Sequence, residues 1–503
     1  MDVLSIVSQL DTLARAIEYL KDPSNPTFHL QNFIENEFLD SEHTSDWINS
    51  LSPRSGEILL KLPRTSPSVV DYAVNVASRA LQAWSQTTPQ KRSEALLRIA
   101  SILQQWKEVF AVWESIDQGK PLLRAQAEVD YAIEHFRYFA GYILHHESAV
   151  RLNKGREEST LTYEHRVPVG VFAIIASSNM PLYILTSKIA ACLAFGCTGV
   201  AKPSELTSMT AFLLSEVLRQ AELPSGVMNI IFGDGPNTGS TLVKSPLVRG
   251  ISFTGGKQTA IQIRKDTATE IDKHLSLEVQ GISPTLVFAD VNIDDAVSAA
   301  VFAAFENSGQ LRLAGSQIHV HRSIYNTFLA RLTKHVLHHC RLDKELGPVV
   351  SQEHYDKVRS YLLQASEENA LLEVGKIPRE ISKEGFWVNA TVLSNVSKDT
   401  IVGREEIFGP VATVFSFDKE EEVVRLCNEN PNVMGAVVLT DDLSRQKRLG
   451  EHLDAGLVWG GCWLGRELGA GFTDIRATGM GREGGAHGRD VFTRLRALHL
   501  PSY

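Results

Sequence analysis

The sequence predicts an α/β protein that has two doubly wound domains and a small β extension. Between Pro168 and Asp290, short runs of β-branched and apolar residues alternate with longer stretches of helical periodicity. This rhythm is typical of parallel β-α-β units, and strands that are apolar along their whole length belong to a sheet covered on both faces. A second alternating region, from about Val301 to Val458, indicates another domain of similar build.

Length and composition set the broad class of the protein. A chain of 503 residues is too long for one compact core, so several domains are expected. The 43% hydrophobic and 22% charged content is that of an ordinary globular protein, and no apolar run reaches the ~20 residues that span a bilayer. A net charge of -9, without a block of basic residues, offers no electrostatic surface for nucleic acid. We therefore expect a small-molecule ligand, and neither a nucleic-acid partner nor a membrane.

The first segment, MDVLSIVSQLDTLARAIEYLKD, is predicted to form an amphipathic helix, which ends at KDPSNP. Its apolar residues recur at helical spacing, and charged residues stand between them. The acidic residues argue against a transit peptide, and the broken apolar run argues against a signal peptide. Such an apolar stripe is usually buried against its own chain, and a contact with a partner protein is the alternative.

The cysteines are few and scattered through the chain. None forms a Cys-x-x-Cys pair, and no histidine is spaced from a cysteine as in a zinc site. We therefore expect a reducing compartment, the cytoplasm, and no metal site.

The first alternating region contains the expected strands VGVFAIIAS, TGVAKPS, VMNIIFG, GISFTGG and SPTLVFAD. The expected helices LTSKIAACLAF and MTAFLLSEVLRQA lie between them. Ligands of such sheets bind beyond the carboxyl ends of the strands, where AKPSE, FGDG and SFTGG are expected to lie. The alternating stretch EESTLTYEHRVPV predicts a strand outside either sheet. Together with DVFTRLRALHLPSY it is expected to form an extension that subunits exchange.

Eleven short motifs together resemble the aldehyde dehydrogenase superfamily, from roughly Asn32 to the C-terminus. In chain order they are NFIENEF, DQGKP, SSNMP, KPSELTS, PSGVMNIIFGDG, ISFTGG, LEVQGISP, FENSGQ, EEIFGPV, GLVWGGCWLGREL and TGMGREGG. Among the subfamilies, KPSELTS and GLVWGGCWLGREL are most similar to the 2-aminomuconate semialdehyde dehydrogenases.

The resemblance implies a domain organisation and an oligomeric state. The implied parts are an N-terminal helical extension (residues 1–27), a dinucleotide-binding domain (28–145 and 169–280), a catalytic domain (281–480) and a β oligomerisation extension (146–168 and 481–503). Members of the family form homodimers and homotetramers, and we expect the same here.

The chemistry of this family needs a cysteine nucleophile, an oxyanion donor, a nicotinamide and a glutamate base. The resemblance places the oxyanion donor at Asn179 and the base at Glu278. In FENSGQLRLAGSQ it places Arg312 where the family has its cysteine. A guanidinium stays protonated and cannot form a thiohemiacetal, so we expect no aldehyde oxidation through a thioester. Arg312 is expected to face Glu278, either as an ion pair that closes the site or as an anchor for a carboxylate or enolate.

Residues of the expected cofactor site are retained in part. The resemblance implies that Lys202 and Glu205 hold the adenosine ribose, and a carboxylate at Glu205 favours NAD over a 2'-phosphorylated cofactor. Gly255 and Gly256 begin the helix expected to bind the pyrophosphate, and Gly256 replaces a serine of the family.

The nicotinamide end of the expected cofactor site is altered. Glu406 and Phe408 match the clamp on the nicotinamide ribose, whereas Gln280 stands where the family has a glycine next to the ring. NAD is therefore expected to keep its adenosine contacts and to lose part of its nicotinamide contacts.

The expected substrate pocket departs from that of the resembled subfamily. Arg466 matches one of the two arginines that hold the acid substrate, and Tyr131 stands at the place of the other. Ser178 replaces a tryptophan of the tunnel wall, so a wider and more polar pocket is expected there. Cys462 lies in a tunnel-lining segment and is the one alternative thiol.

Three functions agree with these residues. The preferred one is a non-redox enzyme that binds a carbonyl compound in the old tunnel, with Glu278 as base and Asn179 as oxyanion donor. The alternatives are a catalytically dead structural or interaction protein, and an NAD-dependent aldehyde oxidoreductase by an unusual route or an active-site variant of one. An open polar cavity into which Arg312 points favours the first function. A cavity filled by Gln280 beside a closed Arg312–Glu278 pair favours the second.

Overall fold

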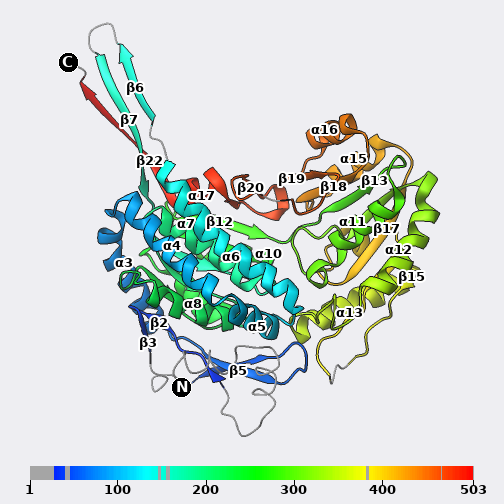
Figure 1. Ribbon diagram of the computed structural model, residues 1–503, viewed down its shortest axis with the longest axis horizontal. Coiled ribbons are helices and arrows are strands. Elements are labelled where there is room, and N and C mark those ends of the chain that lie inside the picture. Colours follow the sequence, from blue (N-terminus) through cyan, green and yellow to red (C-terminus); the bar gives the residue numbers. More distant parts are fainter. Residues whose placement is uncertain are drawn as a thin grey trace.

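The computed structural model describes residues 28–39, 46–145, 149–154, 159–380, 384–465 and 467–501. The predicted N-terminal helix and Arg466 lie outside these residues. The described chain forms two α/β units, each around a seven-stranded sheet, and a three-stranded β arm (Figure 1). The predicted fold class is thereby confirmed. In the described residues, no helix combines the length and the apolar character that crossing a membrane requires.

The first sheet has the strand order β12-β11-β8-β9-β10-β2-β3. Its parallel strands are β8 (Val171–Ile175), β9 (Thr198–Lys202), β10 (Met228–Ile230), β11 (Val248–Gly255) and β12 (His274–Val279). The short antiparallel strands β2 (Phe33–Ile34) and β3 (Glu37–Phe38) extend one edge. Because side chains of a strand alternate between faces, Phe172 and Ile174 enter one buried cluster, whereas Val171 and Ala173 enter another.

Helices cover both faces of this sheet. Helices α4 (Pro89–Gln105), α5 (Lys107–Gln118), α6 (Leu122–Tyr142), α7 (Pro181–Ala194) and α8 (Met209–Gln220) contribute to the first cluster. Helices α3 (Pro67–Ser85), α9 (Ser240–Lys244) and α10 (Lys257–Asp266) contribute to the second. A small sheet of β1 (Phe28–His29), β5 (Ile58–Pro63) and β4 (Trp47–Leu51) adjoins this unit.

The second sheet has the strand order β15-β16-β17-β14-β13-β18-β19. Its strands are β13 (Pro284–Val287), β14 (Gln317–His321), β15 (Leu371–Val374), β16 (Thr391–Ser394), β17 (Val411–Phe417), β18 (Gly435–Leu439) and β19 (Leu457–Gly460). Helices α11 (Ile293–Phe305) and α12 (Tyr325–His339) pack on one face, and α15 (Glu420–Glu429) and α16 (Leu443–His452) pack on the other. Helix α13 (Gln352–Glu367) belongs to a separate cluster with β16 and β17.

Two strands differ from what the sequence predicted. The segment SPTLVFAD, grouped with the first alternating region although it lies within the expected catalytic domain (281–480), forms β13 of the second sheet. Strand β12 was not among the expected strands, because HLSLEV alternates polar and apolar residues, whereas continuous apolar runs were expected for this sheet. The chain passes from β12 to β13 through residues 280–283. The exact limits of the two domains remain predictions.

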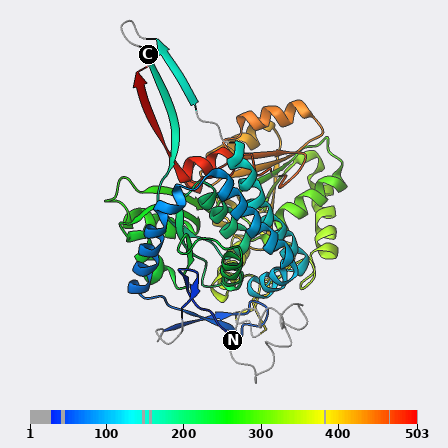
Figure 2. The same ribbon diagram turned by 60° about the vertical axis from the view of Figure 1, so that its left-hand side comes forward.

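The arm consists of β6 (Ala149–Lys154), β7 (Ser159–Pro168) and β22 (Thr493–Pro501), and it projects from the body (Figure 2). Strand β22 pairs with β7 in antiparallel register from Thr493–Pro168 to Pro501–Thr160. Apolar side chains of the arm remain exposed, namely Val150, Leu152, Leu495, Leu498 and Leu500. Exchange of this arm between subunits, and the homodimer or homotetramer, stay predictions.

Candidate ligand cavity and ion network

A cavity of about 110 Å³ lies between α6, α7, the loop at residues 311–313 and α17 (Gly485–Phe492). Helix α6 contributes Arg124, Tyr131, His135 and Phe139, which lie at spacings of seven and four residues and so share one helix face. Tyr131 and His135 both meet Tyr183 of α7 edge to face, with ring centroids 5.8 and 4.7 Å apart. Most of the wall is therefore aromatic or aliphatic rather than polar.

Arg312 lies at the wall of this cavity, and all three of its nitrogens have partners. Its Nε donates to the backbone oxygen of Val279 at 2.9 Å, and one terminal nitrogen donates to Asp474 Oδ1 at 2.5 Å. The other terminal nitrogen lies 3.5 Å from Glu278 Oε2. Burial opposes the positive charge, but Asp474 and Glu278 raise the pKa of Arg312 above its ordinary value. The structure therefore brings Arg312 and Glu278 together in a closed set of contacts.

Lys188 of α7 holds Glu278 from the other side. Its Nζ lies 3.3 Å from Glu278 Oε2 and 2.8 Å from Glu483 Oε1, and it donates to Ser252 Oγ at 3.0 Å. Thr254 donates to Glu278 Oε2 at 2.6 Å. Burial raises the pKa of Glu278, but Lys188 and Arg312 outweigh it and lower that pKa to about 2. The expected base is thus a stable carboxylate at neutral pH.

We call Lys188, Arg312, Glu278, Glu483 and Asp474 the ion network. The ion network contains two cations and three carboxyl groups. It is electrically neutral when one of the three carboxyl groups is protonated. Burial raises the pKa of Asp474 to about 8, against the opposing effect of Arg312. Asp474 Oδ2 has no hydrogen-bond partner among the described residues, and this leaves a place for that proton.

The chain returns to the first sheet to complete the ion network. Gly479 forms an antiparallel bridge with Glu278 at the end of β12, and the backbone nitrogen of Met480 donates to Leu277. This bridge positions Asp474 before it and Glu483 after it beside the carboxyl end of β12. A side chain at Gly481 would lie 2.4 Å from Glu278, so only glycine leaves room for this approach.

Asn179 lines the cavity and is held by several contacts. Its side-chain nitrogen donates to the backbone oxygen of Gln310 at 2.8 Å, and its side-chain oxygen accepts from Ser177 at 2.7 Å. Its backbone oxygen accepts from Asn307 at 3.0 Å and from Lys120 at 3.3 Å. The expected oxyanion donor is therefore fixed, and one of its amide hydrogens already has an acceptor.

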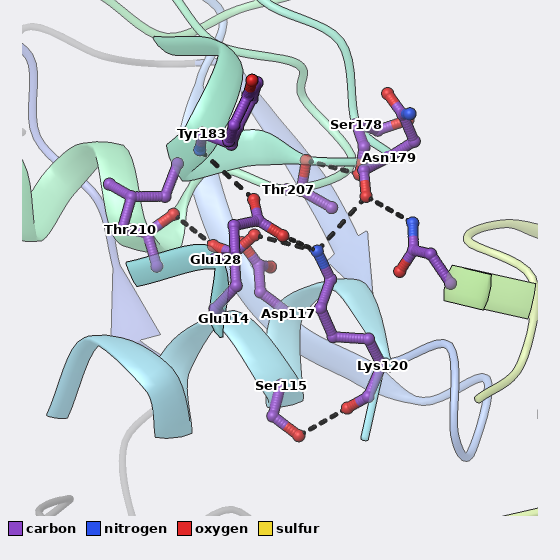
Figure 3. Close-up of polar contacts among 12 residues, drawn as sticks. Glu114, Ser115, Asp117, Lys120, Glu128, Ser178, Asn179, Tyr183, Thr207 and Thr210 are labelled. Carbon is purple, nitrogen blue, oxygen red and sulfur yellow. Dashed lines mark hydrogen bonds and ion pairs between the residues drawn. The ribbon is translucent and has the colours of Figure 1, made fainter. Parts of the chain in front are cut away.

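Behind Asn179 lies a second buried network, which Figure 3 shows around Lys120. Lys120 pairs with Glu114 and Glu128, and Glu114 also accepts from Thr210 at 2.8 Å. Burial and the charge of Glu128 raise the pKa of Glu114 well above its ordinary value. Two carboxyl groups thus share one lysine, and together they hold Lys120 against Asn179.

Asp117 joins this region through the backbone nitrogen of Met209, which donates to it at 2.8 Å. Burial raises the pKa of Asp117 to about 7 from 3.8, so the folded state holds its proton more tightly than the unfolded state. The resulting stability is fully present below pH 3.8 and is lost as the pH rises through 7. We expect the free energy of unfolding of the wild type, relative to Asp117→Asn, to fall by about 1.4 kcal/mol between pH 6 and pH 8.

Urea denaturation of both proteins at several pH values measures this difference. The asparagine side chain keeps the acceptor for the backbone nitrogen of Met209 but does not titrate. The difference between the wild type and this variant therefore cancels the contributions of all other titratable groups. A difference that does not change with pH would show that Asp117 is already ionised in the folded protein.

The residues expected to hold adenosine and pyrophosphate share one edge of the first sheet. Lys202 ends β9 and Gly255 ends β11, and β8 lies between these two parallel strands. Lys202 Nζ lies 3.2 Å from Glu205 Oε2, and the side chain of Glu205 is 34% exposed. Gly256 precedes α10 without a side-chain cap, and a side chain built there would meet nothing within 4 Å. This edge leaves room for an anion at the start of α10.

The residues expected at the nicotinamide ribose come from the segment before β17. Glu406 lies close enough to Arg312 for each to influence the pKa of the other. Burial raises the pKa of Glu406 well above its ordinary value, and its Oε2 has no hydrogen-bond partner in the described part of the chain. Phe408 adopts a left-handed backbone conformation with φ 59°, and its carbonyl accepts from His354 at 2.5 Å.

Three expected positions do not reach the cavity. Ser178, Gln280 and Cys462 are absent from its wall, and Cys462 is exposed. No other cysteine lines the cavity either, among the residues that the structure describes. The wall next to Asn179 is formed by Met180 and Tyr183, so the expected increase in polarity at Ser178 is not seen there.

Sequence reasoning missed Lys188, Asp474 and Glu483. A signal existed for Lys188, because it is the single charge in the apolar helix LTSKIAACLAF, and a buried lysine must find a carboxylate. Asp474 gave no such signal, and Glu483 was visible only as a member of the motif TGMGREGG. Within the described ranges, no group of three or more His, Cys, Asp or Glu residues is arranged to hold a metal ion.

Comparison with known proteins agrees with this geometry. The model of the "Aldehyde dehydrogenase family" matches residues 38–498. The 2-aminomuconic semialdehyde dehydrogenase of Homo sapiens is 38% identical over 490 residues, which cover 94% of this chain and 99% of that protein. The 2-aminomuconic 6-semialdehyde dehydrogenase of Pseudomonas sp is 34% identical and covers 92% and 96%.

Solved structures give the same result. The NAD+ complex of an aldehyde dehydrogenase from Bacillus cereus has a TM-score of 0.90 at 28% identity, over 97% of this chain and 99% of that one. HpcC from Thermus thermophilus has a TM-score of 0.91 at 34% identity, over 98% and 96%. The sequence motifs, the two doubly wound units and these matches lead to one conclusion: the chain belongs to the aldehyde dehydrogenase family.

Proposed function

We propose that this protein is a non-oxidising member of the family that binds a small carbonyl or carboxyl compound in the cavity. In this proposal Arg312 occupies the place of the nucleophilic cysteine. The observation that carries it is the closed set of contacts of Arg312 with Val279, Asp474 and Glu278. A guanidinium cannot attack a carbonyl carbon, and this one already has partners on all three nitrogens. No thiol of the described residues lines the cavity in its place.

The state of Glu278 also supports a binding function over a catalytic one. A general base works best when its pKa lies near the working pH, whereas the pKa of Glu278 is lowered to about 2. Lys188 and Arg312 would have to be displaced before this carboxylate accepted a proton. The closed Arg312–Glu278 pair is the feature expected of a catalytically silent protein, although Gln280 does not fill the cavity.

A non-redox enzyme is the second candidate, and the position of Asn179 favours it. Asn179 lines the cavity, and its amide nitrogen has two hydrogens, of which Gln310 accepts one. The other can polarise a carbonyl oxygen of a ligand. Under this alternative the base is a group other than Glu278.

We also propose that the sheet edge binds NAD. The residues that would hold it are Lys202 and Glu205 at the adenosine ribose, the start of α10 at Gly256 for the pyrophosphate, and Glu406 for the second ribose. The orphaned Oε2 of Glu406 fits this role, because a ribose hydroxyl would give it a hydrogen-bond partner. Bound NAD would supply a hydride acceptor. In this proposal the protein lacks the nucleophile that would turn an aldehyde into a hydride donor. Cytoplasmic location belongs to the same proposal and rests on the scattered free cysteines.

The test is to mix the protein with NAD and a panel of aliphatic and aromatic aldehydes and to follow the NADH absorption band. We expect no NADH above the level of a protein-free control, in the wild type and in Cys462→Ser alike. Calorimetric titration with NAD in parallel shows whether the cofactor is bound under these conditions. Steady NADH formation that survives Cys462→Ser would refute the proposed function.

A further inference from the structure

Two histidines lie one turn apart at the carboxyl end of α12, on the outer side of the second unit (Figure 1). His335 and His339 are four residues apart, so their side chains stand on the same face of the helix. Their ring centroids are 4.3 Å apart, and the ring planes meet at 36°. His335 is partly buried and His339 is exposed, so solvent reaches the pair. No residue of α12 lines the cavity, and the pair is therefore independent of the proposed function.

The ring nitrogens of this pair are not used within the protein. Neither ring forms a hydrogen bond with another residue that the structure describes. The neighbouring His338, in contrast, donates from Nδ1 to the backbone oxygen of Lys334 at 2.7 Å. A neutral imidazole carries a lone pair on one of its two nitrogens. Two such lone pairs are thus available within one turn of α12.

The separation of the two rings suits a shared metal ion. Neutral imidazole is the commonest metal ligand of proteins, and two histidines at positions i and i+4 of a helix can bind one Zn²⁺. With each nitrogen about 2 Å from the metal, the ring centres of such a pair lie roughly 4.5–5 Å apart. The observed 4.3 Å is close to this value. Rotation of the exposed His339 side chain supplies the remainder without a change in the backbone.

The charges around the pair also permit a cation. His335 and His339 belong to the last turn and a half of α12, where the carbonyl groups of a helix carry a partial negative charge. Arg331 lies one turn earlier on the same face, but it pairs with Asp294 at 2.7 Å. The charge of this arginine is therefore balanced before a metal ion arrives.

We propose that His335 and His339 form a surface site for a divalent late transition metal ion, such as Ni²⁺ or Zn²⁺. The described part of the chain offers no group of three or more potential ligands, so the pair supplies two ligands and water supplies the others. Imidazole favours these ions over Mg²⁺ and Ca²⁺, which prefer oxygen ligands. The bound ion links two successive turns and stabilises the end of α12. The expectation of no metal site rested on the spacing around the cysteines, and this pair contains none.

Calorimetric titration of the full chain, carrying no affinity tag, with NiCl₂ and with ZnCl₂ tests the site. We expect the wild type to bind both ions, and the affinity for Ni²⁺ to fall about tenfold or more in His335→Gln and in His339→Gln, because one imidazole alone cannot chelate. His338→Gln is the matched control, since it removes a histidine of the same turn from outside the pair, and it is expected to keep the affinity of the wild type. Titration with MgCl₂ is expected to show no binding that these substitutions change.

Thermal unfolding gives a second readout for the same proteins. Ni²⁺ is expected to raise the melting temperature of the wild type and of His338→Gln more than that of the two pair variants. Melting temperatures without metal show that each variant is folded. Absence of Ni²⁺ binding by the wild type, or equal Ni²⁺ affinity of the wild type and His339→Gln, would overturn the proposal. A loss of affinity in His338→Gln as large as that in His335→Gln would overturn it as well, because the ligands would then not be this pair.

Discussion

Replacing Lys188 by methionine is expected to lower the free energy of unfolding by about 3–5 kcal/mol at neutral pH. The ammonium of Lys188 is fully buried and contacts Glu278 and Glu483 within 3.3 Å. Methionine keeps the volume and the unbranched shape of the side chain, so the packing of α7 changes little. The loss therefore comes from leaving two buried carboxylates with one cation fewer.

Urea denaturation of Lys188→Met and of a matched surface variant measures this effect. Lys265→Met is the control, because Lys265 is an exposed lysine in the last turn of α10, where substitution is expected to change stability by no more than about 0.5 kcal/mol. Because protonation of the carboxyl groups relieves the missing charge, the deficit of Lys188→Met is expected to shrink at acid pH. Equal stability of the two variants at neutral pH would show that Lys188 is not the charge that holds Glu278 and Glu483.

The sequence was sufficient to predict the fold, for physical reasons. Apolar strands such as VGVFAIIAS and helices such as LTSKIAACLAF have periodicities that depend only on neighbouring residues. Strand β12 was missed, and β13 was grouped with the first alternating region although the expected catalytic domain (281–480) contained it, because the point where a chain leaves one sheet for the next depends on long-range pairing. The bridge between Glu278 and Gly479 is an example of pairing that no local pattern reveals.

The candidate site was predicted only where a motif carried it. Glu278, Asn179 and Arg312 lie at the cavity; Glu278 and Asn179 belong to short motifs of the resembled family, and Arg312 lies two residues after one. Asp474 reaches Arg312 across 162 positions of the sequence. Such a contact depends on which side chains meet in space, so no local pattern in the sequence reveals it.

Replacing Arg312 by methionine is the second substitution with a large expected effect. Its side chain is 11% exposed and joins β12 to the segment that carries Asp474. Its removal leaves three carboxyl groups beside Lys188 alone, so we expect the free energy of unfolding to fall by about 3–5 kcal/mol at neutral pH. Chemical denaturation at pH 7 and at lower pH measures this loss, which is expected to diminish as the carboxyl groups take up protons. A variant as stable as the wild type at pH 7 would show that Arg312 is not part of a closed network.

The proposed role of Arg312 depends on its contact with Asp474, and a double-mutant cycle measures the strength of that contact. The free energies of unfolding of the wild type, Arg312→Met, Asp474→Ala and the double variant give the coupling between the two side chains. We predict a favourable coupling of about 2 kcal/mol, because the guanidinium and the carboxyl group are partners in a buried contact. Effects that add to within about 0.3–0.5 kcal/mol would contradict the account, since Arg312 would then be free to act on a ligand.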